Sequence, residues 1–272
     1  MRKLLCIVVC FLLLPRIQAS DAPKYIALTI DDGPSGHFTT ELLDGLKERD
    51  VKATFFICGY RVEQFPRITR RIAGDGHEIG VHGDTHRFFS QMSPREVCED
   101  LQQAMQKIQD ASGQRPTLLR PPGGIFDLAV LGQTVCCDLP VILWSIDVED
   151  WNRNDSDKIA AEIIDQAKNG DIILLHDTKE SSVKAALKIV DILQARGFEF
   201  VTVSELAEAF GTSLSGCQAY YQFRFPKKEV ISSSVAVKEP CAKVGLPPPR
   251  PFKAVFKLRT SSRKSPSCVP KA

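Results

Sequence analysis

The sequence predicts an α/β fold: a distorted (β/α) barrel of about seven parallel strands, with a catalytic site at the C-terminal ends of the strands. Two observations predict it. Short apolar runs alternate with amphipathic stretches, and chemically active polar residues follow the ends of several of these runs. Apolar strands covered by helices are typical of a parallel sheet. Seven such units in succession favour a barrel over a short open sheet without forcing that choice.

The apolar runs that we expect to form strands are residues 25–30, 53–58, 77–81, 117–120, 141–146, 171–176 and 198–203. Amphipathic stretches with apolar residues at helical spacing lie between them. We expect helices over residues 39–50, 94–112 and 182–197. Ser93-Pro94 and Asp155-Ser156 are typical helix starts, because these side chains cap free backbone N–H groups.

The N-terminus reads as a secretory signal peptide over residues 1–19. Arg2 and Lys3 precede an apolar run at 4–14, and a small-residue cleavage site ends at Ala19. The run is shorter than the roughly 20 apolar residues that a membrane span needs. We therefore expect a secreted or cell-wall, extracytoplasmic protein with no transmembrane span after the signal is removed.

Charge divides the rest of the chain into a body, residues 20–215, and a tail, residues 216–272. Residues 21–215 contain 20 Lys and Arg and 31 Asp and Glu, a net charge of −11. The tail contains 12 Lys and Arg and 2 Asp and Glu, a net charge of +10. The proline-containing tail is expected to be disordered. It could instead tether the protein to an anionic cell wall or form a small folded appendage. No nucleic-acid partner is expected.

Polar residues with catalytic potential follow five of the expected strands. They are Asp31 and Asp32 after the first strand, His82 and His86 after the third, Arg120 at the end of the fourth, Asp147 and Asp150 after the fifth, and His176 at the end of the sixth. In a (β/α) barrel these strand ends meet at one face. We therefore expect these side chains to form one site.

Two histidines four residues apart, His82 and His86, can meet one metal ion, although the spacing alone is a modest signal. A carboxylate from another strand would complete the set, and Asp32 is the candidate. Two histidines and one carboxylate leave positions open for water and substrate. The neighbouring Asp31 then stays free to take a proton from water. Zinc suits these ligands best, but cobalt, nickel or manganese would also be held.

Five ordered motifs make residues 24–210 resemble the polysaccharide deacetylase domain, carbohydrate esterase family 4, also called the chitooligosaccharide-deacetylase homology domain. The family motif TFDDGP is similar to TIDDGP at 29–34, and H-[ST]-x-x-H to HGDTH at 82–86. RPPY, D-x-x-D-W and L-x-H are similar to RPPG at 120–123, DVEDW at 147–151 and LLH at 174–176. Each motif is weak alone, but all five in this order are highly specific.

The resemblance implies a role for each matching residue. Asp31 would be the general base and His176 the general acid, with Asp150 tuning His176 and Arg120 keeping the base ionised. The implied metal ligands are Asp32, His82 and His86. The implied apolar pocket for the acetyl methyl group is formed by Trp151 and Leu174, although Trp151 could also be a core residue.

Two glycines depart from the family pattern. Gly83 replaces a Ser or Thr whose hydroxyl braces the histidine loop, which puts the ligand geometry in doubt. Gly123 replaces an aromatic residue whose backbone N–H serves the oxyanion in the family. Glycine keeps that N–H but removes a wall of the substrate groove. We therefore expect a more open site with altered substrate preference.

The expected function is a metal-dependent removal of acetyl groups from N-acetylglucosamine in a polysaccharide, with peptidoglycan first and chitin oligomers second. Acetyl-xylan, an O-ester substrate, is the third candidate. A non-catalytic carbohydrate-binding relative is the alternative of a different class, but such a protein typically loses the base or a metal ligand. A cell-wall interaction protein that acts through its tail is a further alternative.

Overall fold

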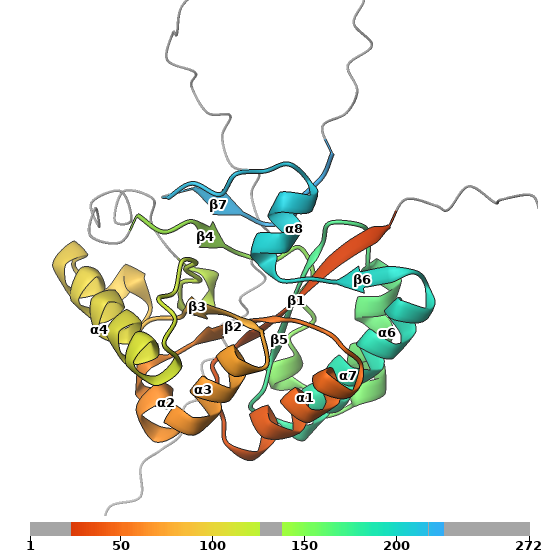
Figure 1. Cartoon of the computed structure of the whole chain (residues 1–272), viewed down its shortest axis with the longest axis horizontal. Helices are drawn as coiled ribbons and strands as arrows, with labels where there is room; N and C mark the ends of the chain where they lie inside the picture. The colour runs from red at the N-terminus through yellow and green to blue at the C-terminus, as the bar shows by residue number, and fades with distance from the viewer. Residues whose placement is uncertain (1–22, 126–137, 217, 226–272) are drawn as a thin grey trace, which may run out of the picture. The chain divides into compact units, whose positions relative to one another are not determined.

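The computed structural model describes residues 23–125, 138–216 and 218–225. The expected signal peptide, and the tail from residue 226 onward, lie outside this described part. The strands are β1 Lys24–Asp31, β2 Thr54–Ile57, β3 Glu78–Val81, β4 Val141–Ile142, β5 Ile172–His176, β6 Phe198–Phe200 and β7 Ala219–Tyr220. They alternate with helices along the chain, as Figure 1 shows.

All the paired strands of the described chain are parallel, which confirms the predicted fold class. The main sheet has the order β3-β2-β1-β5, and β6 also pairs with β1. Single parallel bridges join Val81 to Leu119 and Leu119 to Val141, and another joins Ile146 to Ile173 of β5. Pairing therefore passes from β3 through residues 117–120 and 141–146 back to β5. The predicted fourth strand is reduced to one bridged residue, which is the distortion of the barrel.

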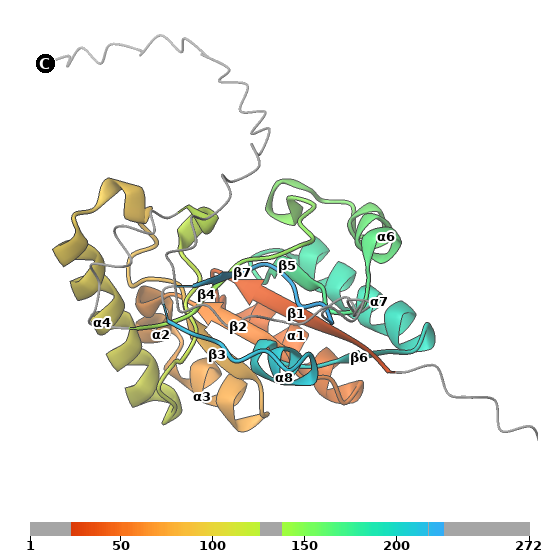
Figure 2. The same ribbon diagram turned by 90° about the horizontal axis from the view of Figure 1, so that it is seen from above.

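The helices are α1 His37–Glu48, α2 Gly59–Gln64, α3 Pro66–Gly74, α4 Pro94–Ser112, α6 Ser156–Gln166, α7 Glu180–Ala195 and α8 Val203–Ala209, with short 3₁₀ turns η1 Phe89–Gln91, η2 Pro122–Gly124 and η3 Asp150–Asn152. The view in Figure 2 shows α2, α3 and α4 on one side of β1 and α6 and α7 on the other. The structure confirms the three helices that the sequence predicts, and α4 has the predicted bounds.

Local capping explains where α4 and α8 begin. The Ser93 hydroxyl accepts a hydrogen bond from the Glu96 N–H, and the Glu96 carboxylate accepts one from the Ser93 N–H, which makes a complete capping box. A second capping box, formed by Thr202 and Glu205, begins α8 at Val203. This is why the expected strand 198–203 ends early, at Phe200.

Alternation along the strands separates two layers of side chains. In β1, Ile26, Leu28 and Ile30 belong to the apolar cluster that includes residues of the surrounding helices. Ala27 belongs instead to a second buried cluster with Phe56, Ile142 and Ile172. Thr29 and Asp31 share the face of Ala27, because successive side chains point to opposite sides. The polar ends of the strands are therefore directed to the inside of the barrel.

The body continues past residue 215 into the stretch assigned to the tail. β7 pairs in parallel with β4, and Tyr220 and Phe223 are buried. The Arg224 guanidinium donates a hydrogen bond to the Asn169 carbonyl at 2.7 Å and forms an ion pair with Asp171. Tyr220 and Phe223 complete the second buried cluster, so the fold needs this segment.

In the described residues, no helix combines the length and apolar character required to cross a bilayer.

Candidate functional site

Strand register brings the candidate base and acid side by side. Asp31 at the end of β1 is the direct partner of His176 at the end of β5, and both side chains are buried. His82 follows β3 directly, and the Arg120 N–H donates to the Val81 carbonyl next to it. Backbone pairing alone thus places these four residues at one end of the barrel.

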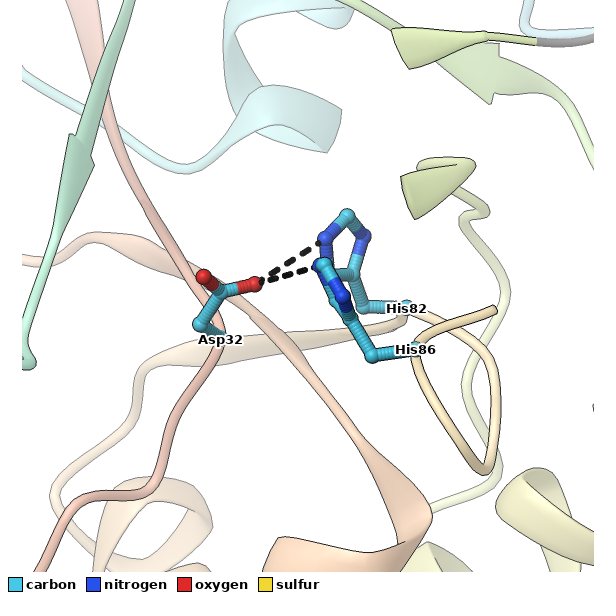
Figure 3. Close-up of side chains that lie close together, drawn as sticks. All are labelled: Asp32, His82 and His86. Atoms are coloured by element: carbon cyan, nitrogen blue, oxygen red, sulfur yellow. Dashed lines mark ion pairs between the residues drawn. The ribbon is translucent and has the colours of Figure 1, made fainter. Parts of the chain in front are cut away.

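Asp32, His82 and His86 converge as the sequence predicts (Figure 3). One carboxylate oxygen of Asp32, Oδ1, lies 3.0 Å from His86 Nε2 and 3.3 Å from His82 Nε2. The candidate ligand atoms of all three residues lie within 4.8 Å of one another. Asp32 and His86 have φ angles of 69° and 60°, a region that Asp and His tolerate better than most residues.

The arrangement fits a divalent cation. Asp32 Oδ1 is buried yet has no hydrogen-bond partner among the described residues. His82 Nδ1 lies 2.6 Å from the Arg120 carbonyl oxygen, which can only accept, so Nδ1 carries the proton and Nε2 offers its lone pair to the site. Ligands at about 2.0–2.2 Å from one ion are separated from each other by roughly 3 Å, which is close to the distance of Asp32 Oδ1 from each histidine Nε2. Three protein ligands are the number typical of catalytic metal sites, in which a further position holds water or substrate.

The charges of this cluster favour a cation. Burial by itself would raise the pKa of Asp32, but the imidazoles of His82 and His86 outweigh burial and hold that pKa well below its usual range. The Asp32 carboxylate in turn raises the pKa of His86, against the opposing effect of burial. Positive charge between these ligand atoms is therefore favoured, whether protons or a metal ion carry it.

Arg120 is the partner of Asp31 and is fully buried. Its Nη1 lies 2.7 Å from Asp31 Oδ1 and donates to the Thr29 hydroxyl at 2.8 Å. Its other nitrogens donate to the carbonyls of Ile142 and Leu143, each at 2.9 Å. Burial lowers the pKa of Arg120, and the attraction of Asp31 opposes that effect. With its nitrogens partnered, the guanidinium fixes the Asp31 carboxylate in one orientation.

Asp150 orients His176. Its Oδ1 lies 2.8 Å from His176 Nδ1, and its Oδ2 accepts the His176 backbone N–H at 3.0 Å. Burial lowers the pKa of His176, but the hydrogen bond and charge of Asp150 outweigh it and raise that pKa to about 9. With Nδ1 occupied, Nε2 faces Asp32, 4.0 Å from its Oδ2. His176 can therefore hold a proton at Nε2, facing the cluster of Asp32, His82 and His86.

Asp100 of α4 braces the histidine loop, which answers the doubt raised by Gly83. Its carboxylate accepts hydrogen bonds from the Asp84 N–H at 2.6 Å, the Thr85 N–H at 3.2 Å and the Thr85 hydroxyl at 2.8 Å. Gly83 has a φ of 76°, and a Cβ there would lie 2.9 Å from Asp100 Oδ2. A serine at this position would be strained at that φ and would displace the Asp100 carboxylate, so glycine suits the position that Asp100 braces.

The three substrate-binding candidates occupy different environments. Leu174 is buried two residues before His176, on the same face of β5. Trp151 follows Asp150 in η3 and is 54% exposed, so it is not a core residue. Gly123 lies in η2, where the Phe88 ring fills the space beside it. The acetyl pocket of Trp151 and Leu174 stays a prediction, but the space beside Gly123 is not open as expected.

Sequence reasoning missed Asp100, Phe88 and Asp177. Asp100 interrupts the apolar stripe of α4 between Val97 and Leu101, and a carboxylate on a buried helix face is a signal that could have identified it. Asp177 is fully buried next to His176, and the Thr39 hydroxyl donates to it. Burial raises the pKa of Asp177 to about 7, against the effect of that hydrogen bond. No sequence signal distinguishes Phe88.

The family model described as "Polysaccharide deacetylase" matches residues 18–141. A peptidoglycan-N-acetylglucosamine deacetylase of Bacillus cereus is 37% identical over 67% of this chain and 88% of its own length. A chitooligosaccharide deacetylase of a Bradyrhizobium species is 33% identical over 67% of this chain and 90% of its own length. The peptidoglycan-N-acetylglucosamine deacetylase PgdA of Listeria monocytogenes is 34% identical over 76% of this chain. This chain spans 43% of the length of that relative.

Solved structures agree with this likeness. A family 4 acetyl xylan esterase from Clostridium thermocellum, in complex with a cobalt ion, has a TM-score of 0.68 at 32% identity, covering 73% of this chain and 98% of that one. Both the sequence and the backbone thus resemble enzymes that act on acetylated polysaccharides.

Replacing Asp100 by Ala is expected to weaken zinc binding by about 10- to 100-fold, the usual effect of losing a group that orients metal ligands. The loop that carries His82 and His86 would lose three hydrogen bonds. Isothermal titration calorimetry of the metal-free protein with zinc measures the change. Asp110→Ala, which removes an exposed carboxylate from the same helix, is the matched control. Equal zinc affinities in the two variants would show that Asp100 does not support the ligands.

Proposed function

The chain belongs to the polysaccharide deacetylase family, carbohydrate esterase family 4, and we propose that it hydrolyses the N-acetyl group of N-acetylglucosamine residues in a polysaccharide. The products are acetate and a free amine. One observation carries this proposal: the buried Asp31–Arg120 and His176–Asp150 pairs lie beside a cluster that fits a metal ion. A base, an acid and a cation site at one barrel end are the parts that amide hydrolysis requires.

The proposed metal is a divalent cation held by Asp32, His82 and His86, with zinc first and cobalt, nickel or manganese possible alternatives. The spacing of the ligand atoms and the unpartnered Asp32 oxygen support a cation, and the cobalt ion in the acetyl xylan esterase supports a metal in this family. When bound, it would polarise the acetyl carbonyl and stabilise the negative charge that develops on its oxygen.

Proton transfers are assigned to the chain's own residues. Asp31, fixed by Arg120, accepts a proton as a water molecule attacks the acetyl carbon. His176, protonated and held by Asp150, donates a proton from Nε2 to the amide nitrogen as the carbon–nitrogen bond breaks. The water oxygen stays in the acetate, and the sugar keeps the nitrogen as an amine. The Gly123 N–H is the proposed hydrogen-bond donor to the oxyanion.

Peptidoglycan is the favoured substrate and chitin oligomers are the second choice. Relatives named for peptidoglycan N-acetylglucosamine and for chitooligosaccharides support this order. Acetyl-xylan remains the third candidate, because a structural neighbour is named for it. A non-catalytic carbohydrate-binding role is disfavoured, since the base, the acid and the three ligand residues are all present and close together.

We further propose that the protein is exported through residues 1–19 and acts on the cell wall. The basic stretch from residue 226 onward would contact an anionic wall polymer. The sequence pattern supports both proposals: a basic start followed by a short apolar run, and a surplus of Lys and Arg near the C-terminus.

The test of the function is acetate release from peptidoglycan, chitin oligomers and acetyl-xylan, with and without a chelator. We expect release from peptidoglycan, its loss on chelation and its recovery with zinc or cobalt. Asp31→Asn should keep the metal and lower the rate by about 10²–10⁴-fold, as expected for a general base. Asp32→Asn should lose the metal itself, as elemental analysis would show.

Three results would contradict this scheme. Acetate release at full rate from an exhaustively chelated protein would exclude the metal mechanism. Loss of metal in Asp31→Asn but not in Asp32→Asn would reverse the two assignments. No acetate from any of the three substrates, with the metal bound, would rule out the proposed activity.

The pH profile tests His176. A general acid must be protonated, so kcat/KM should fall as pH rises through the pKa of His176, which Asp150 raises. Asp150→Asn removes the charge that opposes burial, so the alkaline limb should move to lower pH. A bound cation lowers the pKa of His176 in both proteins, so the comparison is made with the metal bound in each. An alkaline limb at the same pH in both proteins would show that a group other than His176 determines the fall of kcat/KM.

The tail is tested with a chain that ends at Phe225, because β7 and Phe223 belong to the fold. We expect this shorter chain to turn over small soluble N-acetylglucosamine oligomers as the full chain does. It should sediment less with cell-wall material. The difference should vanish at high salt, because exposed charges are screened within about 8 Å even at physiological ionic strength. Equal, salt-insensitive sedimentation of both chains would exclude the wall contact.

A further inference from the structure

Phe88 is an exposed aromatic residue beside the metal cluster. It lies two residues after His86, in the loop that leaves the cluster, and 37% of it is exposed to solvent. Its ring centroid lies 6.5 Å from that of His86, one of the three candidate ligands. A large apolar side chain in this position costs free energy by its contact with water. Its location next to polar, reactive groups calls for an explanation.

The same ring fills the space beside Gly123. A Cβ added to Gly123 would lie 2.9 Å from Phe88 Cε1, with Cδ1 and Cζ at 3.6 and 3.7 Å. Gly123 also has a φ of 64°, where a side chain would be strained. Position 123 therefore cannot carry an aromatic side chain of its own while Phe88 is in place. The loop after β3 supplies the aromatic ring that the segment after residue 120 lacks.

We propose that Phe88 is a substrate-binding residue whose exposed ring forms the wall of the sugar groove beside Gly123. This inference rests on the proposed function and adds a residue that positions its substrate. Pyranose rings have an apolar face of C–H groups, and aromatic rings offer apolar area with little loss of conformational entropy. A sugar stacked on the solvent-exposed part of the Phe88 ring would have its acetamido group directed toward Asp32 and His86, because the Phe88 and His86 rings are neighbours.

A purely structural role for Phe88 makes a different prediction. If the ring only supports the backbone of Gly123, its removal should lower the melting temperature, and kcat should fall because the Gly123 N–H would move. If the ring binds the sugar, its removal should raise KM for oligosaccharides while kcat, zinc affinity and melting temperature stay nearly constant. The split between KM and kcat therefore separates the two roles.

The experiment compares Phe88→Ala, Phe88→Leu and Phe88→Tyr in the zinc-loaded full chain, with an N-acetylglucosamine tetramer and peptidoglycan as substrates. Phe88→Ala is expected to raise KM about 3- to 10-fold, the range of a single aromatic contact. Phe88→Leu keeps a side chain against Gly123 but loses the flat ring, so its KM should also rise. Phe88→Tyr keeps the aromatic ring, so its KM should stay within about twofold of the wild-type value. Tyr221→Ala, at a comparably exposed aromatic on the segment after β7, is the matched control and should change nothing.

Binding of the tetramer is measured in parallel by calorimetry in the slowly reacting Asp31→Asn protein, with and without Phe88→Ala, so that hydrolysis contributes little to the heat. An unchanged KM and affinity in Phe88→Ala would overturn the inference and leave the proposed deacetylation intact. Wild-type protein that binds the tetramer through Phe88 but releases no acetate would support the role of Phe88 and contradict the proposed deacetylation. A fall in melting temperature and kcat in both Phe88→Ala and Phe88→Leu, with KM constant, would assign the ring a structural role.

Discussion

The buried contact between Arg120 and Asp31 organises the catalytic end of the barrel. The guanidinium is fully buried and is bonded to Asp31, to Thr29 of the same strand, and to the carbonyls of Ile142 and Leu143. It also lies over the Phe56 ring, at 4.1 Å. Removing one partner from a buried ion pair costs about 3–5 kcal/mol, because an uncompensated charge remains. The strand ends are therefore held in the arrangement that keeps this group satisfied.

This constraint accounts for the distorted part of the barrel. Residues 117–120 and 141–146 are joined to each other and to β3 and β5 through single bridges, whereas β1, β2, β3 and β5 form continuous ladders. Two carbonyls of the irregular segment are satisfied by the side chain of Arg120. Buried backbone groups need partners, and a side chain can supply them as well as a strand can. The irregular backbone near the site is thus a consequence of placing a guanidinium inside the barrel.

Asp31, His176 and the candidate metal-binding loop each depend on a group that other elements supply. Arg120 fixes Asp31, Asp150 orients His176, and Asp100 braces the loop of His82 and His86. Each group acts through hydrogen bonds from a rigid or buried position, so the reactive atoms have little freedom to move. Asp32 Oδ1 is the exception, since it is buried without a hydrogen-bond partner in the described part of the chain. A cation at that atom would satisfy it.

The sequence by itself determined the features that depend on local patterns. Alternating apolar runs determined the strands of a parallel fold, the capping box at Ser93 began α4, and the five motifs supplied the candidate site residues. Tertiary structure alone decided three others: Asp100 as the brace, Phe88 beside Gly123, and β7 as part of the fold. The physical reason is distance along the chain. These roles arise from contacts between segments far apart in sequence, and local spacing contains no information about which distant side chain will fill a given space.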